Sequence, residues 1–485
     1  MVCMVLSGVA SPAAAGPLIE AGDMALRHDI QRLADAGVIQ GTVTTWPMAW
    51  GPVLRDLDNV DLSMLRPDVA DAVLRVRSRG NEETRTDQWM FQADAGGADN
   101  ATRIRSFQDT PRGKADVSVG GQWLGEHVSI DLNASYVESS QDDDGLRFDD
   151  THIAVAVGNW SAAISAKERW WGPSWDGSLI LSNNARPMPA FVVDRIFTDA
   201  FETKWLSWLG PWDLTVMFGL LEEERHVPNA QFFGTRFNFR PLPSLELSVF
   251  RTALWCGDNR PCDFDTFVDL LLGRDNRGDE GIDGSNEPGN QLAGLDFRWT
   301  PGFLGRATSF YGQFVGEDEA GGFPSKWLGQ FGAEWSGYLF DRWSTRVYGE
   351  VSATSCQFYE SSEIYNCAYN HGIYQTGYRY RGRALGHGAD NDTRIASLGV
   401  VAVDADSTQW QALVRFGKLN RGGAADANNS LTPTPQDMAS VDVSHSRRFS
   451  FGVIDAGIGV ERIDDAASGS ESTDARLYLQ WRSAF

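Results

Sequence analysis

Apolar and polar residues alternate with a period of two along much of this chain from about residue 86 onward. The clearest stretches are residues 128–136, 153–157, 295–299 and 331–335, each with apolar side chains at every second position. Successive side chains of a β-strand point to opposite faces of the sheet, so each stretch predicts a strand with one apolar face. Dividing the roughly 400 residues after position 85 by about 22 for a strand plus its connection predicts about 18 antiparallel strands.

The last strand carries the most specific pattern. Residues 475–485 alternate strictly, with one face formed by Leu477, Leu479, Trp481 and Phe485 and the other by Arg476, Tyr478, Gln480 and Arg482. An aromatic residue closing such a strand is typical of bacterial outer-membrane barrels, whose apolar face meets lipid. The pattern therefore predicts an all-β transmembrane barrel in contact with outer-membrane lipid.

The residues before the barrel have a helical pattern instead. Asp23 can cap a helix whose apolar positions, such as Leu26, Ile30 and Leu33, lie on one face, and this helix should stop at Gly37. A second amphipathic stretch begins at Pro67. We expect residues 16–85 to form a small helical periplasmic segment that caps the mouth of the barrel rather than one that binds a partner, and residues 86–485 to form the barrel with extracellular loops.

The first fifteen residues resemble a secretory signal. An apolar stretch, residues 2–9, leads to the small residues Ser11-Pro12-Ala13-Ala14-Ala15, a cleavage site of the A-x-A kind. No basic residue precedes the apolar stretch, which suggests that the charged end of the signal is missing from this sequence. We therefore expect residues 1–15 to be a signal peptide, truncated at its start, and the protein to be exported.

Composition supports export to the outer membrane and argues against other classes. No run of eighteen or more apolar residues occurs, which excludes a membrane protein built from spanning helices. The chain contains 18 Trp, 26 Phe, 11 Tyr and 50 Gly, and barrels use aromatic residues at the membrane interfaces and glycine in turns. The formal net charge of -23 disfavours nucleic acid as a partner.

The cysteines predict disulfides rather than a metal site. Removal of Cys3 with the signal leaves Cys256, Cys262, Cys356 and Cys367. Their spacings fit no zinc motif, so in an oxidising periplasm we expect the pairs Cys256–Cys262 and Cys356–Cys367. The acidic stretch 142–150 could gather calcium, but its spacing is not that of the twelve-residue calcium loop and an acidic solvated turn is favoured. We expect no cofactor and no metal.

Residues 167–187 (KERWWGPSWDGSLILSNNARP) carry a more specific resemblance. This segment, together with residues 25–50, 223–230, 270–276 and 377–383, is similar to the Wzi family of capsule assembly proteins. The resemblance implies an outer-membrane barrel of this size with a helical periplasmic segment. It also implies a lectin that attaches capsular or exported polysaccharide to the cell surface. The identity of the polymer does not transfer with the fold.

Two clusters offer the chemistry that a sugar-binding surface needs. Aromatic faces stack on pyranose rings, and guanidinium groups pair with the carboxylates of acidic sugars. The candidate residues for polysaccharide binding are Arg169, Trp170, Trp171, Trp175, Tyr378, Arg379, Tyr380, Arg381 and Arg383. A hydrogen-bonded plug in the lumen is the alternative role for both clusters. If the second cluster is a strand, alternation points Arg379, Arg381 and Arg383 inward.

Three functions remain open at this stage. We favour a monomeric outer-membrane lectin that attaches or organises surface polysaccharide. A diffusion porin is the alternative, and an enzyme is disfavoured because no G-x-S-x-G motif occurs and no local Ser-His arrangement resembles that of the barrel lipases. The long irregular stretches 257–291, 355–393 and 422–442 should be extracellular loops or lumen plugs, since irregular backbone cannot face lipid.

Overall fold

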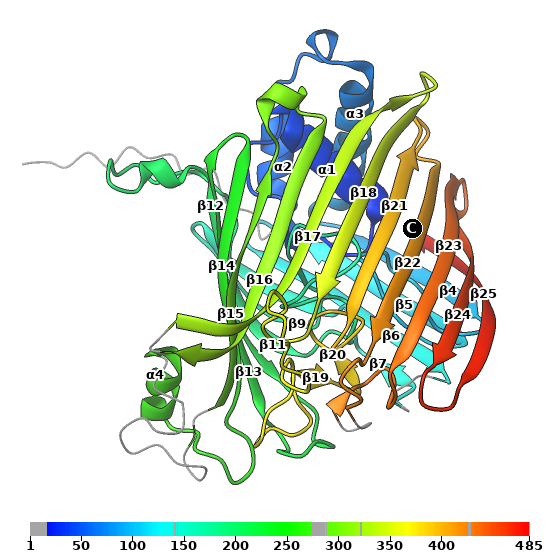
Figure 1. Cartoon of the computed structure of the whole chain (residues 1–485). Helices are drawn as coiled ribbons and strands as arrows, with labels where there is room; N and C mark the ends of the chain where they lie inside the picture. The colour runs from blue at the N-terminus through cyan, green and yellow to red at the C-terminus, as the bar shows by residue number, and fades with distance from the viewer. Residues whose placement is uncertain are drawn as a thin grey trace, which may run out of the picture.

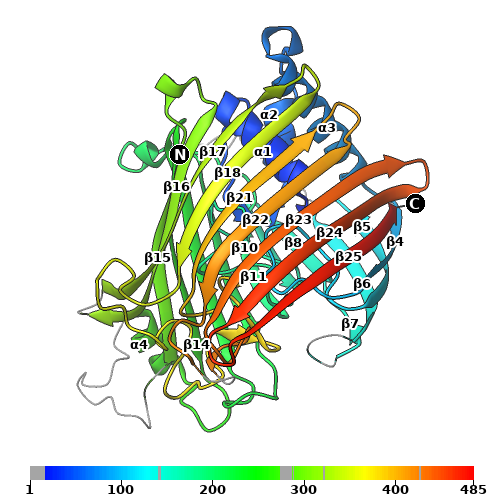
Figure 2. The same ribbon diagram turned by 45° about the vertical axis from the view of Figure 1, so that its right-hand side comes forward.

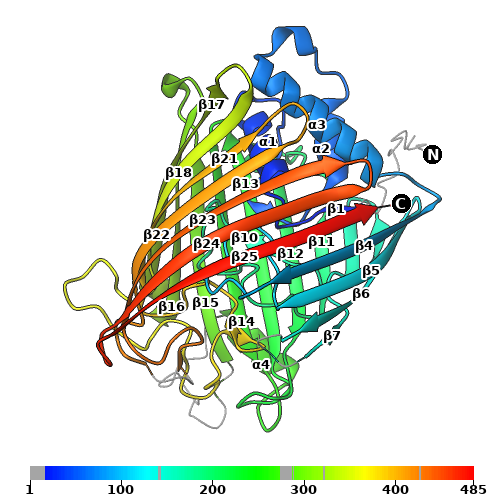
Figure 3. The same cartoon turned by 90° about the vertical axis from the view of Figure 1, so that its right-hand side faces the viewer.

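A single closed barrel dominates the computed structural model, which describes residues 17–139, 142, 144–272, 287, 289–320, 323–424 and 428–484. Within these residues, eighteen antiparallel strands, not counting the two-residue β7, surround the lumen, which confirms the predicted fold and strand number. The barrel closes where β25 pairs with β4 (Figure 3). The predicted signal peptide, residues 1–15, and Phe485 lie outside the described residues.

The wall strands run in chain order around the barrel, with the two-residue β7 beside the direct pairing of β6 with β8. Their bounds are β4 Trp89–Ala98, β5 Ala115–Leu124, β6 Val128–Glu138, β7 Leu146–Arg147, β8 His152–Val157, β9 Trp160–Ser165, β11 Ala190–Arg195, β12 Trp212–Leu220, β13 Gln231–Leu242, β14 Leu245–Trp255, β15 Gly289–Trp299, β16 Thr308–Ala320, β17 Phe323–Leu339, β18 Trp343–Ala353, β21 Arg394–Val403, β22 Gln409–Leu419, β23 Gln436–Phe449, β24 Gly452–Asp465 and β25 Ser470–Ala484.

The predicted alternation gives the wall its two faces. In β25, Leu477 and Leu479 are each 58% exposed on the outer face, whereas Arg476 is 9% exposed and points inward. In β8, Ile153 and Val155 likewise point outward, between buried neighbours. The outer face is therefore apolar, as lipid requires, and the lumen face is polar.

The connections differ in length at the two ends of the barrel. Most are short at the end that carries α1–α3, which we call the helix end, and long at the opposite end, which we call the loop end (Figures 1 and 2). The predicted C-terminal boundaries of the irregular stretches 257–291 and 422–442 were wrong, because β15 begins at Gly289 and β23 at Gln436. These strand starts line the lumen or extend beyond the lipid, and they are therefore rich in polar residues. Because they lack the apolar alternation of the other wall strands, the sequence pattern did not reveal them.

Short helices accompany the barrel. They are α1 Met24–Ala36, α2 Trp50–Leu57, η1 Leu62–Met64, α3 Pro67–Glu83, η2 Ser207–Leu209, α4 Phe264–Leu272 and η3 Gly302–Leu304. The predicted start of α1 is confirmed, because the Asp23 carboxylate accepts a hydrogen bond from the Leu26 amide at 2.9 Å. The predicted stop is confirmed as well, because Gly37 adopts the left-handed conformation with φ 81°. Helix α2, with its internal Pro52, was not predicted.

Helix α1 does more than cover the helix end, because its polar side chains pair with the inner wall. The carboxylate of Asp35 accepts from Arg298 of β15 at 2.6 Å, and His28 contacts Ser344 of β18 at 2.8 Å. On the other side of α1, Arg32 pairs with Asp68 of α3 at 2.8 Å. The helix is thus held between the wall and α3 by buried polar contacts.

Two chain segments far apart in sequence meet inside the barrel. Strand β2 (Thr45–Trp46) pairs antiparallel with β10 (Trp170–Trp171), and both strands are buried. A second small sheet joins β1 (Leu18–Ile19) to β3 (Met48–Ala49). The β2–β10 pairing ties the N-terminal segment to the segment that follows β9.

Replacing Arg298 with alanine should detach α1 from the wall. The change leaves the carboxylates of Asp35 and Glu334 buried without this partner, which should lower the free energy of unfolding by about 3–5 kcal/mol. Urea unfolding of the purified barrel, followed by the heat-modifiable shift on gels, measures the loss. Arg462→Ala removes exposed ion pairs of β24 and should leave the free energy of unfolding nearly unchanged. Equal losses in the two variants would contradict the assigned role of Arg298.

Candidate functional site

Residues 166–189, which we call the plug segment, cross the lumen and hydrogen-bond to its wall. The Glu350 carboxylate of β18 accepts from the backbone amides of Trp175 and Asp176, at 2.6 and 3.0 Å. Gln313 of β16 donates to the Trp171 carbonyl at 2.8 Å and accepts from the Leu179 amide at 2.6 Å. Inward-facing polar side chains of the wall therefore satisfy the irregular backbone of the plug segment.

The first predicted sugar-binding cluster lies inside this plug segment. Trp170, Trp171 and Trp175 are each 0% exposed, and Arg169 is 7% exposed. The guanidinium of Arg27 from α1 lies 4.3 Å from the Trp175 ring centroid and donates to the carbonyls of the plug segment. The three indole rings have no face open to a sugar, so their contacts support the structural alternative for this cluster.

The second predicted cluster lies in the connection between β18 and β21. It forms a separate hairpin, β19 (Arg379–Tyr380) and β20 (Arg383–Ala384), rather than a strand of the wall, so the inward alternation expected for a wall strand does not apply. Arg381 and Gly382 form the turn, both with positive φ, as tight two-residue hairpins require. The hairpin lies toward the loop end (Figure 1).

The base of the hairpin is locked, and only its turn is open. Tyr378 is 0% exposed and donates its hydroxyl to the Ile180 carbonyl at 2.8 Å. Arg379 pairs with the buried Asp390 at 2.7 Å. Tyr380 is 6% exposed, whereas 30% of the Arg381 side chain is exposed. Of these four residues, Arg381 is therefore the one placed to meet a ligand.

Both predicted disulfides are present. Cys256 bonds to Cys262 and Cys356 bonds to Cys367, each within a long connection at the loop end. The acidic stretch that was weighed as a calcium site pairs with arginines instead. Asp142 contacts both Arg147 and Arg186, at 2.7 and 2.6 Å.

Six arginines from four segments of the chain line one open hollow at the loop end, which we call the arginine pocket and whose empty space, part of it open to solvent, is about 350 Å³. They are Arg105, Arg112, Arg147, Arg186, Arg381 and Arg383. Arg105 and Arg112 come from the β4–β5 connection, Arg147 from β7 and Arg186 from the plug segment. The structure thus brings the predicted Arg381 and Arg383 together with four arginines that the sequence did not single out.

Positive charge is crowded in the arginine pocket. Burial, together with the neighbouring Arg105 and Arg112, lowers the pKa of Arg383 to about 9. Burial and Arg112 likewise lower the pKa of Arg105 to about 10. Carboxylates of the protein offset part of this charge, as Glu168 does for Arg112 at 2.5 Å. A bound anion would stabilise the charged form of these guanidinium groups.

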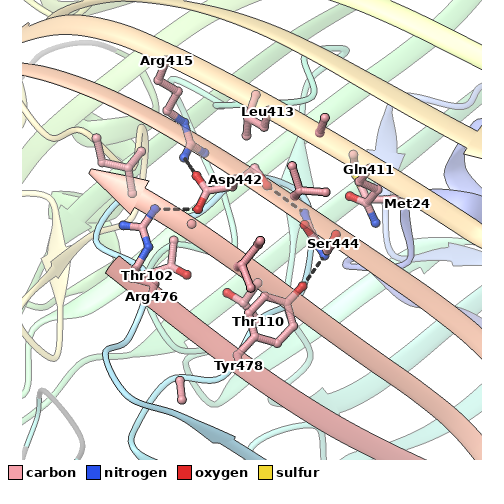
Figure 4. A pocket seen from close by; sticks show the side chains of 18 of the residues that line it. Met24, Thr102, Thr110, Gln411, Leu413, Arg415, Asp442, Ser444, Arg476 and Tyr478 are labelled. Carbon is pink, nitrogen blue, oxygen red and sulfur yellow. Dashed lines mark hydrogen bonds and ion pairs between the residues drawn. The ribbon is translucent and has the colours of Figure 1, made fainter. Parts of the chain in front are cut away.

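A second hollow lies between the β4–β5 connection and the wall strands β21–β25, and we call it the wall cavity (Figure 4). Its empty space, part of it open to solvent, is about 700 Å³, and Thr102 lines both this cavity and the arginine pocket. Its charges are paired, because Asp442 contacts Arg476 at 2.6 Å and Arg415 at 3.6 Å. Hydroxyl and amide groups complete its lining: Gln108 donates to Ser444 at 3.0 Å and to Tyr478 at 2.9 Å.

Comparison with known proteins gives the family. The family model described as "Capsule assembly protein Wzi" matches residues 85–475. The chain belongs to the Wzi capsule assembly family. A relative from Klebsiella pneumoniae, an uncharacterised 55.8 kDa protein in the cps region, is 34% identical over 324 residues. That match covers 66% of this chain and 62% of the relative, so the chain aligns with less than two thirds of the relative's length.

A solved member of the Wzi family shares the whole fold. This structure is Wzi of Escherichia coli, described as an outer-membrane protein involved in group 1 capsule assembly and as a carbohydrate-binding β-barrel. It is 25% identical, with a TM-score of 0.83, and the match covers 97% of this chain and 100% of that one. The chain is therefore an outer-membrane β-barrel of the Wzi family.

Among the described residues, no group of three or more His, Cys, Asp or Glu side chains is arranged to hold a metal ion. None of the helices in the same part of the chain is long and apolar enough to cross a bilayer.

The arginines that the sequence did not reveal are spread over positions 105–186, and no local motif joins them. Arg186 was visible at the end of the 167–187 segment that carries the resemblance to the Wzi family, but its role was not assigned. Arg105, Arg112 and Arg147 stand alone in polar connections. Only the closure of the barrel places these connections beside the β19–β20 hairpin.

Replacing Arg379 with alanine should loosen the β18–β21 connection rather than weaken a sugar contact directly. The change leaves Asp390, which is 0% exposed, without its arginine and should cost about 3–5 kcal/mol. Limited proteolysis of the purified barrel should show faster cleavage within residues 355–393. Arg394→Ala, which removes a largely exposed arginine paired with Glu363, is the control and should leave cleavage nearly unchanged. Normal resistance in Arg379→Ala would argue against this locked base.

Proposed function

We propose that this Wzi-family barrel attaches or organises capsular or exported polysaccharide at the cell surface as a non-catalytic, monomeric lectin. The helix end faces the periplasm and the loop end faces outward. The lengths of the connections support this orientation, because bacterial outer-membrane barrels have short periplasmic turns and longer extracellular loops. The carbohydrate binding described for the Escherichia coli relative supports the activity.

The arginine pocket is the observation that carries this proposal. It gathers six guanidinium groups at the end assigned to the cell exterior, in a chain whose formal net charge is -23. Guanidinium groups form strong, paired hydrogen bonds with carboxylates, which suits sugars that carry acidic groups. Arg381, at the turn of its hairpin, is the contact residue best placed for the polymer, with Arg383 beside it. Repetition of weak contacts along a polymer would raise the total affinity through avidity.

A diffusion porin, the alternative function, is less well supported. The plug segment, helix α1 and the β2–β10 sheet occupy the lumen and are hydrogen-bonded to its wall. Paired charges also line the wall cavity beside them. A solute would have to displace these contacts to pass through the barrel.

Deleting the gene should release surface polysaccharide into the medium, and the wild-type gene should restore its retention. The Arg381→Glu variant should assemble normally but restore little retention, because it reverses the charge at the turn. Staining of cell-bound and released polymer gives the measurement. Arg462→Ala is the matched control, because it removes an exposed arginine of β24 outside the pocket. Full retention by Arg381→Glu would place polymer binding elsewhere on the loop end.

Binding of purified polymer to the purified barrel should depend on acidic groups. We expect Arg381→Ala to weaken binding by about tenfold, the loss of one charge-assisted hydrogen bond. Reduction of the polymer's carboxyl groups to alcohols should weaken binding to the wild type and narrow the difference between wild type and Arg381→Ala. Calorimetry with native and reduced polymer tests both effects. Equal affinity for the two polymers would refute recognition through carboxylates.

The wild-type barrel should pass no steady ionic current in planar bilayers, because its lumen is filled. A diffusion porin inserted under the same conditions serves as the positive control. Stable conductance steps of porin size would favour the alternative function.

A further inference from the structure

The connection between β11 and β12, residues 196–211, is the longest at the helix end among the described residues, and we call it the arm. Figure 1 shows it projecting outward from the wall near β12, away from the lumen. Most neighbouring connections at this end are tight turns, such as the one between β13 and β14. The arm therefore differs from most other connections at the helix end, and it is not part of the plug inside the lumen.

The arm has a fixed conformation. Its backbone is hydrogen-bonded within itself, from the Ser207 amide to the Thr203 carbonyl at 2.9 Å and from the Leu209 amide to the Leu206 carbonyl at 3.0 Å. Gly210 returns the chain to the wall with φ 67°, and a Cβ at this position would lie 2.0 Å from the Arg240 carbonyl oxygen. Only glycine fits there, so the sequence specifies this path.

The root of the arm packs on the lipid-facing side of the wall. The ring of Phe201 stacks on Trp212 of β12, with centroids 4.4 Å apart, and Trp208 meets Phe239 of β13 edge-on at 6.2 Å. Phe239 points away from the lumen, since its neighbours Asn238 and Arg240 are buried inward. The arm thus continues the outer, apolar surface of the barrel.

Beyond this root, large apolar side chains have no protein cover. Trp205 is 88% exposed, Trp208 is 61% exposed and Leu206 is 42% exposed, with the exposed Lys204 next to them. Two largely bare indoles on one short projection are costly in water. Indole rings are favoured where a membrane meets water, and a lysine can extend from there to lipid phosphates.

We propose that the arm lies in the headgroup region of the membrane leaflet at the helix end and binds phospholipid through Trp205, Leu206 and Trp208. Its occupant is lipid because the arm is continuous with the lipid-facing wall, and its hydrogen-bonded backbone suits a poorly hydrated setting. Lys204 pairs with lipid phosphates at the same depth.

The arm also links the membrane to the helical segment. At its root, Asp199 pairs with Arg55 of α2 at 2.9 Å, and the Arg55 guanidinium lies 5.0 Å from the Phe197 ring centroid. Anchoring the arm therefore limits the motion of α2 against the membrane surface.

Depth measurement by spin labelling tests this proposal. A nitroxide on Ser207→Cys, in a Cys3→Ser background, leaves Trp205 and Trp208 in place. The labelled barrel is reconstituted in phosphatidylethanolamine–phosphatidylglycerol vesicles, after its heat-modifiable shift has verified assembly. Collision with oxygen reports lipid, and collision with a water-soluble nickel chelate reports solvent. Met64→Cys, at an 82% exposed position of η1, is the aqueous reference, and Leu479→Cys, on the outer face of β25, is the lipid reference.

The label on Ser207→Cys should show an oxygen-to-nickel ratio several-fold above that of Met64→Cys and toward that of Leu479→Cys. Adding Trp205→Ser and Trp208→Ser should move this ratio back toward the aqueous reference. A ratio equal to that of Met64→Cys would overturn the proposal. Low collision with both reagents would also overturn it, since it would indicate a second copy or another protein on the arm. If Ser207→Cys does not assemble, Thr203→Cys in the same arm takes its place.

Discussion

The polar face of the barrel wall has to be satisfied inside the lumen, and the rest of the structure depends on this constraint. Alternation that turns apolar side chains toward lipid also turns charged ones inward, where an unpaired ion costs several kcal/mol. Arg298 illustrates the solution, because it contacts Asp35 of α1 and Glu334 of the neighbouring wall at 2.6 and 2.5 Å. The wall and the segments within it therefore stabilise one another, and neither is complete alone.

Because of this constraint, the polar side chains that support the segments inside the lumen differ from those that can contact a ligand. Glu350 and Gln313 use their hydrogen-bonding capacity on the backbone of the plug segment, which leaves little for a ligand. Toward the loop end the balance changes, because arginines outnumber the carboxylates that line the same hollow. Carboxylates around the hollow pair with several of these arginines, as Glu168 does with Arg112 and Asp149 with Arg186, so guanidinium groups from separate segments lie close together in an otherwise strongly acidic chain.

Much of the fold could be predicted from the sequence, because period-two alternation and helix capping are local. The two faces of β25, the ends of α1 and both disulfides follow from neighbouring residues alone. The site was harder to predict. The sequence offers Trp170 and Trp175 as aromatic binding residues, yet the closed barrel buries both side chains. Arg105 and Arg147 form a candidate site only because the folded chain brings their separate segments together. The residue types near a tryptophan in the sequence do not show whether its indole is buried or exposed. Burial in the closed barrel decided which candidate residues are open to a ligand.

The pairing of β2 with β10 has a consequence for how the molecule is held together. Its two strands enter the lumen from opposite sides of the membrane, the first with the helical segment and the second from the β9–β11 connection. Their pairing lies inside a wall that is closed by the seam between β25 and the first wall strand, β4. Loss of the β2–β10 pairing would therefore uncouple the N-terminal segment from the plug segment without opening the wall itself.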